Sequence, residues 1–186
     1  MSTIMLYSRY VHWLDDPRLT AAGLFTEAYT GVMARITPTL SEAGLSPVDF
    51  ETLLRLARSP GHQLRMSELA AQTNLSTSGI TRVVDRLERD NLVERRVCIY
   101  DRRALHATIT EEGLARLNKV LPQHLADIER WFTGLLSPEQ LDALLEALRI
   151  IRDVVRPEAT AGAERGTQEG GCDLERGGPE KGCELA

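Results

Sequence analysis

The sequence predicts a mainly α-helical fold with a small β-wing, in which a winged helix-turn-helix is joined to a helical dimerisation region made by the N- and C-terminal helices. Residues 66–90 read as two short helices around a tight turn, and residues 92–109 read as two β-strands around a polar loop. Long amphipathic segments at 17–42 and 110–155 flank this centre. A chain of 186 residues can bury one substantial core, so one domain is expected.

The segment before that centre begins with an apolar stretch, residues 1–16, which we expect to form an extension with a short helix. Asp16 and Pro17 then resemble a helix cap followed by proline at the first helical position. The helix from Pro17 to about Glu42 should be kinked or ended early by Pro38. Its expected core residues are Leu24, Phe25, Ala28, Val32, Ile36 and Leu40.

A second start signal, Ser46 to Asp49, opens a helix that ends near Ser59 and Pro60. The residues that this helix is expected to bury are Phe50, Leu53, Leu54, Leu56 and Ala57. Leu64 and Arg65 are expected to add a third short strand to the wing sheet.

The second helix of the helix-turn-helix, from Ser76 to Asp90, has two different faces. Its apolar stripe at i, i+3, i+4 and i+7 spacing must be buried: Ile80, Val83, Val84 and Leu87. Its other face carries hydroxyls in the first turn and is arginine-rich further along: Ser78, Thr81, Arg82, Asp85 and Arg89, with Arg86 at the edge. Ser76 and Thr77, at the start of the helix, are also predicted to contact DNA. Such hydroxyls suit phosphate and base-edge contacts, and arginine forks onto guanine or phosphate. The helix is therefore predicted to enter a DNA major groove.

The helix before it, Ser67 to Thr73, turns inward Leu69 and Ala70, and Asn74 suits the sharp turn between the two helices. The strands after it flank a loop with Asp101, Arg102 and Arg103. An arginine at such a tip can reach a minor groove, so the motif is predicted to bind DNA with both its helix and its wing.

These residues carry a family resemblance. Thr81 to Glu88, Leu92 to Arg95 and Asp101-x-Arg103-Ala104 resemble the MarR family of winged-helix transcriptional regulators, and the resemblance runs from about residue 19 to residue 155. It implies a DNA-binding homodimer with Arg103 in a minor groove, and Asp85 and Asp101 holding the wing in place. The loop at 97–100 is more apolar than the family's usual loop.

The overall charge of −5 hides a local basic region. From Ser76 to His106 there are seven arginines against five acids, a balance of +2, whereas residues 156–186 have four bases against seven acids, a balance of −3. Phosphate contact requires only a local basic face, so the total does not argue against DNA. Residues 156–186 are rich in glycine and charge and are expected to be a disordered tail.

Other sites are not indicated by the sequence. No apolar run approaches a membrane span and no secretion signal is visible, so a soluble, cytoplasmic protein is expected. Cys98 is interpreted as a packing residue rather than a redox switch, and Cys172 and Cys183 have no metal-site spacing. No cofactor, metal or catalytic constellation is predicted.

After the wing, residues 110–132 and 138–155 read as two more amphipathic helices, with Pro122 expected to bend the first and Ser137 and Gln140 expected to cap the second. Together with the helix from Pro17, they carry more apolar surface than a small winged helix covers. A homodimer on a pseudo-palindromic operator is therefore expected.

A small aromatic or anionic effector between the lobes is also considered. A family subgroup with an added N-terminal helix binds urate-like anions through a tryptophan, an acid and arginines. Trp13 and Arg82 match that pattern by position, but Glu51 stands where aspartate is expected. Trp13, together with Tyr7 and Tyr10, is more readily interpreted as a core residue.

The function that these observations predict is a ligand-responsive, sequence-specific transcriptional regulator, usually a repressor in the family, and not an enzyme. Two alternatives stay open at this stage. The helix face of Ser76 to Asp90 would also serve a protein-interaction module without DNA binding, and Arg82 and Arg86 would also suit pairing with Asp85 or Glu88. A small enzyme using the cavity between the lobes is the other.

Overall fold

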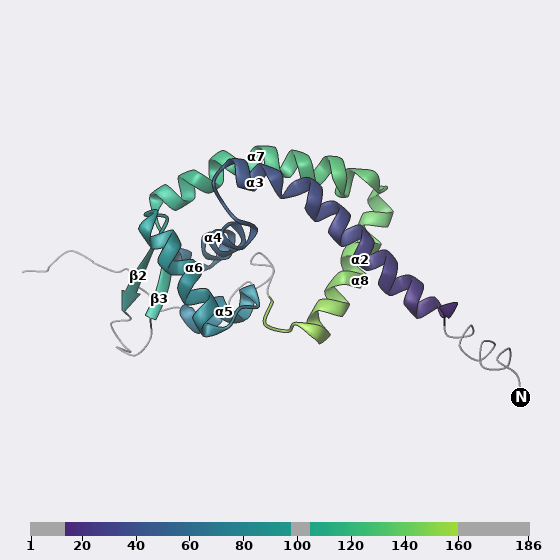
Figure 1. The fold of residues 1–186 in the computed structure, drawn as a ribbon, viewed down its shortest axis with the longest axis horizontal. Coiled ribbons are helices and arrows are strands. Elements are labelled where there is room, and N and C mark those ends of the chain that lie inside the picture. The colour runs from purple at the N-terminus through teal and green to yellow at the C-terminus, as the bar shows by residue number, and fades with distance from the viewer. Residues whose placement is uncertain (1–13, 98–104, 160–186) are drawn as a thin grey trace, which may run out of the picture. The chain divides into compact units, whose positions relative to one another are not determined.

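The structure, a computed structural model, describes residues 14–97 and 105–159. Its elements fall into two compact units, whose parts are coloured along the chain in Figure 1. The first unit contains the residues up to Gly44 and residues 120–143, and the second contains residues 45–119 and those from Leu144 onward. The described chain is mainly helical with one three-stranded antiparallel sheet, which confirms the predicted fold class.

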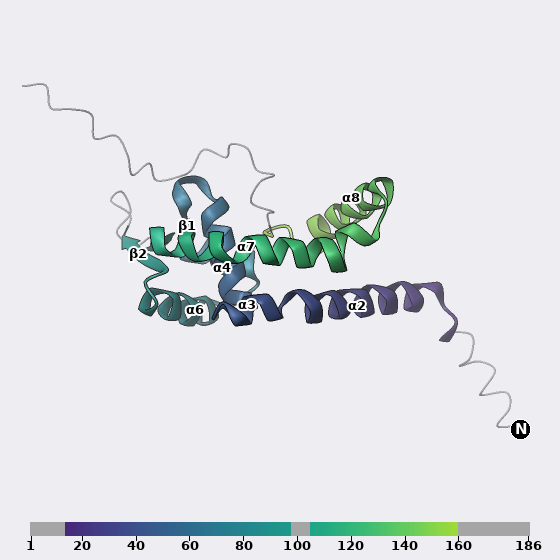
Figure 2. The ribbon, with the colours of Figure 1, turned by 90° about the horizontal axis from the view of Figure 1, so that it is seen from above.

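The first unit begins with α2 (Pro17–Ile36) and α3 (Pro38–Glu42). The Asp16 carboxylate accepts a hydrogen bond of 2.9 Å from the backbone N–H of Arg18, so the predicted cap is present. Pro38 has no N–H to donate to the preceding turn, and the helix breaks at Thr37, as expected. In Figure 2, α3 follows α2 along nearly the same line.

The break between α2 and α3 is held by α7 (Glu111–Trp131). A continuous helix would direct the Leu40 N–H to the Ile36 carbonyl, but Leu40 donates to the Thr37 carbonyl instead, at 3.0 Å. The Ile36 carbonyl lies 3.2 Å from Nδ1 of the buried His124. A donor from α7 thus satisfies the acceptor that the break exposes.

Two further contacts join these helices. The Thr39 hydroxyl donates to Asp127, and this hydrogen bond is the main cause that lowers the pKa of the Asp127 carboxyl below its usual value. The guanidinium carbon of Arg35 on α2 lies 4.7 Å from the centre of the Trp131 ring on α7, within cation–π range, and that of Arg130, the neighbour of Trp131 on α7, lies at the same distance.

The second unit holds the winged helix. Its elements are α4 (Pro47–Arg58), η1 (Pro60–His62), β1 (Gln63–Arg65), α5 (Met66–Thr73), α6 (Thr77–Arg89), β2 (Val93–Val97) and β3 (Leu105–Ile109), followed by the start of α7. The strand order is β1-β3-β2, and Ala107 of β3 stands opposite Leu64 on one side and Arg95 on the other. The predicted third strand is therefore confirmed.

The core of this unit is tightly closed. Its most buried side chains are each no more than 1% exposed: Leu53, Leu56, Leu69, Ile80, Val84, Leu87, Leu92 and Val93. Gly113 packs against the chain at the start of α7, where a β-carbon would lie 2.2 Å from the Leu92 carbonyl oxygen. Only a glycine fits at this point without moving the backbone.

The remaining helix is α8 (Pro138–Val155), which follows the short η2 (Thr133–Leu135). Ser137 and Gln140 form the expected capping box, since the Ser137 N–H donates to the Gln140 side chain and the Gln140 N–H donates to the Ser137 hydroxyl. Pro122 lies inside α7, which continues past it. None of the described helices is long and apolar enough to cross a membrane.

Two expectations need correction. Leu24, Phe25 and Ala28 of α2 were expected in the core, but all three are exposed in the single chain, Leu24 at 62% and Phe25 at 61%. Helical spacing identifies an apolar face without saying which chain covers it.

The predicted start of the disordered tail at residue 156 is also wrong, because Arg156 donates to the Gln72 carbonyl at 3.1 Å and Ala159 is buried. The rest of the tail, and the expected helix within residues 1–13, lie outside the described residues.

Candidate nucleic-acid interface

The turn between α5 and α6 shapes the start of the candidate interface. Asn74 adopts the left-handed conformation with φ 57°, as the sequence predicts for a sharp turn. Ser76 caps α6 through a 3.1 Å hydrogen bond from the Gly79 N–H to its hydroxyl, and its hydroxyl also lies 3.1 Å from that of Ser78. The first turn of α6 therefore presents ordered hydroxyls beside a positive helix end.

The two faces of α6 separate as predicted. The apolar stripe is buried: Ile80, Val83, Val84 and Leu87. The residues predicted for DNA contact in the first turns are all exposed: Ser76, Thr77, Ser78, Thr81 and Arg82. Among the described residues no acid pairs with Arg82, whereas the Thr81 hydroxyl donates to the Thr77 carbonyl at 2.7 Å. This face offers a free guanidinium and hydroxyl groups to a ligand.

Arg86 is placed differently from Arg82. Its Nε lies 3.1 and 3.2 Å from the two carboxylate oxygens of Asp49 on α4, and its Nη2 also donates to that carboxylate. Asp49 is only 5% exposed, while the Arg86 side chain keeps 42% of its surface exposed. The sequence left two interpretations of Arg86, DNA contact or an ion pair within α6. The structure shows a third arrangement, an ion pair with Asp49 of α4.

The first wing strand is joined to α6 by Arg95. This side chain of β2 forms ion pairs with Asp85, at 2.5 Å, and with Glu88, and it donates to the Thr81 carbonyl at 3.2 Å. Three groups of α6 therefore hold one arginine that is 19% exposed. Asp85, which the family resemblance assigns to wing support, does contact the wing strand, through Arg95.

The wing tip lies outside the described residues, and with it Asp101, Arg102, Arg103 and Cys98. The strands on each side of it are described and pair from Val93 with Ile109 to Val97 with Leu105. The expected wing therefore has its two strands in place, and the roles of its tip residues stay predictions.

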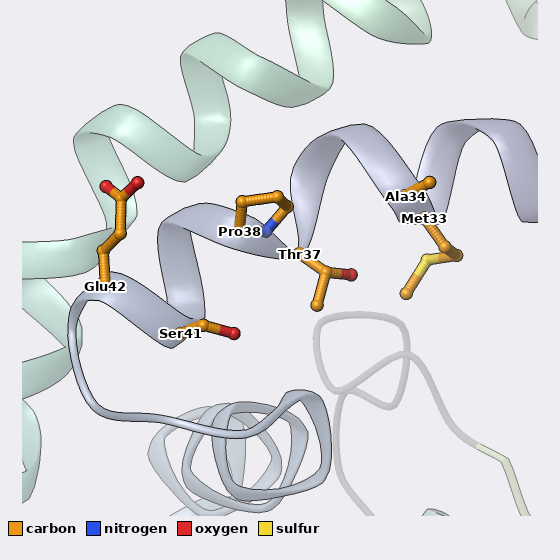
Figure 3. Close-up of a pocket in the computed structure, with 6 residues that line it drawn as sticks. All are labelled: Met33, Ala34, Thr37, Pro38, Ser41 and Glu42. Carbon is orange, nitrogen blue, oxygen red and sulfur yellow. The ribbon is translucent and has the colours of Figure 1, made fainter.

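The candidate ligand residues are not brought together in the described chain. Trp13 lies outside it, and Glu51 forms an ion pair of 3.2 Å with Arg55, one turn along α4. A hollow of about 660 Å³ lies beside the α2–α3 break. Figure 3 shows the side chains that line it. Its lining residues are Met33, Ala34, Thr37, Pro38, Ser41 and Glu42. No cluster of metal-ligating side chains occurs among the described residues.

Two residues of this interface were not identified from sequence. Asp49 reads as an ordinary residue of a helix start, and Arg95 reads as one basic residue of a strand. Each acts on a partner far along the chain, Asp49 on a residue 37 positions later and Arg95 on residues 7, 10 and 14 positions earlier. No sequence spacing signals such pairs.

The sequence of this chain is similar to those of known transcriptional regulators. The model of the MarR family matches residues 43–104, a range that includes α4, α5, α6 and β2. The HTH-type transcriptional regulator MhqR of Bacillus subtilis is 31% identical over 126 residues, which cover 68% of this chain and 85% of MhqR.

Solved structures agree with the described fold. The crystal structure of AbsC, a MarR family transcriptional regulator from Streptomyces coelicolor, has a TM-score of 0.73 and 38% identity, and the match covers 78% of this chain and 98% of AbsC. Sco3205, a MarR family regulator from the same organism solved in complex with DNA, has a TM-score of 0.70 and 30% identity, with 77% and 90% of the two chains covered.

Proposed function

Because the chain belongs to the MarR family of transcriptional regulators, we propose that it is a dimeric, sequence-specific DNA-binding repressor that responds to a small ligand. The observation that carries the proposal is the exposed face of α6, where hydroxyls of the first turns and Arg82, which pairs with no acid among the described residues, lie opposite a buried apolar stripe. An α-helix of this kind fits the B-DNA major groove. The DNA complex of Sco3205, 30% identical to this chain, supports the same mode of action.

In this proposal, Ser76, Thr77, Ser78, Thr81 and Arg82 contact bases and phosphates in the major groove, and Arg102 and Arg103 reach the flanking minor groove. Asp101 supports the wing tip and Arg95 fixes the wing strand to α6, through Asp85 and Glu88. The protein works in the cytoplasm, where its DNA lies.

The dimer is supported by apolar surface that the single chain leaves uncovered. On α2 and α8 the large exposed side chains include Leu19, Leu24, Phe25, Tyr29, Ile150, Ile151 and Val154. Burying a side chain of this size contributes about 1.5–3 kcal/mol, so a partner surface is strongly favoured. A two-fold dimer covers both copies of this surface and matches the symmetry of a palindromic operator.

The proposed effector site is the hollow beside the α2–α3 break. The hollow beside α2 and α3 has a volume within the range of small-molecule sites, and its lining mixes apolar groups with two hydroxyls. Its charged lining residue is Glu42, so this hollow fits an aromatic effector better than an anion. A ligand there would change DNA affinity only by its different affinities for the free and DNA-bound forms.

The experiment that tests the proposed function is a mobility-shift titration with duplex DNA from upstream of the protein's own gene, at several salt concentrations. Retention is expected, and Arg103→Ala should weaken it and reduce the slope of log affinity against log salt by about 0.9, the value of one phosphate equivalent. No retention of the wild-type protein at low salt would favour a protein-interaction module instead. An unchanged slope in the variant would remove the wing arginine from the interface.

A further inference from the structure

Among the described residues, Asp49 is the one acid whose side chain is buried. An ionised carboxylate loses its hydration when it is buried, and this cost is offset only when hydrogen-bond donors surround it. Asp49 has such donors from two elements. The Ser46 N–H and hydroxyl donate at 3.2 and 2.6 Å, and the Arg86 guanidinium donates from the other side.

These contacts give Asp49 two separable tasks. Toward Ser46 it completes the capping box of α4, which is a local task within one helix end. Toward Arg86 it holds a side chain of α6, the helix that presents the proposed DNA-binding face. The contact with Arg86 therefore does two things, since it offsets the burial of the Asp49 carboxylate and it also fixes a side chain of α6.

The contacts of Arg86 fix the orientation of its guanidinium group. Its Nε and Nη2 are turned to Asp49, and in the described part of the chain its Nη1 has no recorded acceptor. The side chain remains 42% exposed, so this last edge of the guanidinium is accessible. A planar guanidinium gripped along one edge has a fixed orientation at its other edge.

The position of Arg86 on α6 selects the kind of DNA group it would meet. Arg86 follows Arg82 by one helical turn and lies between the buried stripe and the exposed face, at the flank of the reading surface. With its Nε–Nη2 edge occupied by Asp49, Arg86 keeps one further edge, formed by Nη1 and the second N–H of Nη2, and its place at the flank of α6 directs that edge away from the centre of the reading surface. A single accessible edge suits a backbone phosphate at the rim of the groove.

We propose that Asp49 is a positioning residue for DNA binding, which holds Arg86 so that its free edge meets a phosphate beside the major groove. This inference rests on the proposed function and deepens it. It assigns Arg86 an effect on affinity and on register along the duplex, and none on the choice of base.

The test exploits a conflict between simple electrostatics and positioning. Asp49→Asn removes a negative charge near the DNA, which by charge alone should tighten binding. Positioning predicts the reverse, because the freed Arg86 must be ordered again when DNA binds, and affinity should fall about fivefold. Arg86→Ala should lose about tenfold and reduce the salt slope by about 0.9.

Affinities would be measured by fluorescence anisotropy on the upstream duplex and on a mixed-sequence duplex of equal length. The loss should be similar on both probes, since a phosphate contact carries no sequence information. Arg86→Ala combined with Asp49→Asn should bind no more weakly than Arg86→Ala alone. Ser46→Ala is the matched control, because it weakens the cap of α4 and leaves the Asp49–Arg86 pair, so its DNA affinity should stay near the wild-type value.

The possible results distinguish a failure of the positioning role of Asp49 from a failure of the proposed DNA-binding function. If Asp49→Asn, shown to be folded by circular dichroism, binds as tightly as the wild type or more tightly, Asp49 does not position a contact. An unchanged salt slope in Arg86→Ala would mean that the pair only joins α4 to α6, and an equal loss in Ser46→Ala would mean that the effect comes from the helix cap. In all three cases wild-type binding would stand, whereas wild-type protein that retains neither probe would overturn the proposed function as well.

Discussion

The winged helix and the helices α2 and α8 use apolar residues in opposite ways. In the winged helix, Leu53, Leu56 and Ile80 are completely buried within one chain. In α8 no residue is buried, and α2 buries only Ile36 at its end, although both helices are rich in large apolar side chains. The winged helix therefore has its own closed core. The helices α2 and α8 instead carry large apolar side chains that the single chain leaves exposed.

The two regions should therefore respond differently to substitution. A closed core resists changes through the free energy of unfolding of the single chain. An open apolar face should respond through association, because its stabilisation arises only when a second surface covers it. Each of the following substitutions tests one side of this contrast.

The largest effect is expected on the open face. Phe25→Glu places a charge on a residue that is 61% exposed in the single chain and that the proposed dimer buries in both copies. Losing two such aromatic side chains should weaken association by about 3–6 kcal/mol, since each contributes roughly 1.5–3 kcal/mol. Sedimentation equilibrium would measure this loss.

The control for that experiment is Thr20→Glu, a similar change at an exposed polar position of the same helix. It should leave the dimer intact. If Phe25→Glu associates as strongly as the wild type, α2 is not part of the dimer surface.

The second-largest effect is expected on the free energy of unfolding, after a substitution in the closed core of the winged helix. Leu56→Ala removes a side chain with no exposed surface and should reduce the free energy of unfolding by about 2–5 kcal/mol, through lost transfer energy and the cavity left behind. Urea unfolding followed by circular dichroism would measure it. Arg58→Ala, at an exposed site two residues along the same helix, should change little, and a similar loss in both variants would contradict the closed core.

A pair of glycine substitutions should have opposite signs in the two regions. At Gly113 a methyl group would meet the Leu92 carbonyl at 2.2 Å and Ile109 at 2.6 Å, so Gly113→Ala should destabilise by about 1–3 kcal/mol. At Gly23 in α2 a methyl group meets nothing within 4 Å, so Gly23→Ala should stabilise by up to about 1 kcal/mol through helix propensity. Thermal unfolding measures both, and equal signs would remove the contrast.

The smallest effect concerns acid stability in the first unit. The Thr39 hydroxyl lowers the pKa of Asp127, so this pair contributes stability above the ordinary aspartate range, and the contribution is lost as pH falls through the lowered value. Thr39→Val should return the pKa of Asp127 toward its usual value near 3.8. Titration of the carboxyl by NMR would show the upward shift, and an unmoved pKa would mean that the Thr39 hydroxyl is not its cause.

The order of elements was predictable because local chemistry marks each helix start. Asp16 with Pro17, Ser46 with Pro47 and Ser137 with Pro138 each occur where a helix begins, and the turn at Asn74 has the left-handed conformation that its residue type suggests. The buried stripe of α6 and its exposed polar face also followed from helical spacing alone. These are properties of neighbouring residues, which sequence records directly.

What sequence could not supply depends on contacts between distant residues and between chains. Nothing in the spacing links Asp49 to Arg86, and nothing links Arg95 to Asp85 and Glu88 across the turn into β2. The exposure of Leu24 and Phe25 likewise depends on whether a second surface is present, which periodicity does not encode. Sequence thus identified the face of α6 but not the ion pairs that join α6 to α4 and to β2.

The break at Pro38 also limits how the N-terminal helices can be borrowed for other uses. The acceptor that it exposes on Ile36 is served by His124, a residue 88 positions away. A fusion tag cut from α2 and α3 alone would leave that carbonyl to water and would lose the Thr39–Asp127 bond with it. A fragment that keeps the native break between α2 and α3 would therefore also need the part of α7 that contains His124 and Asp127.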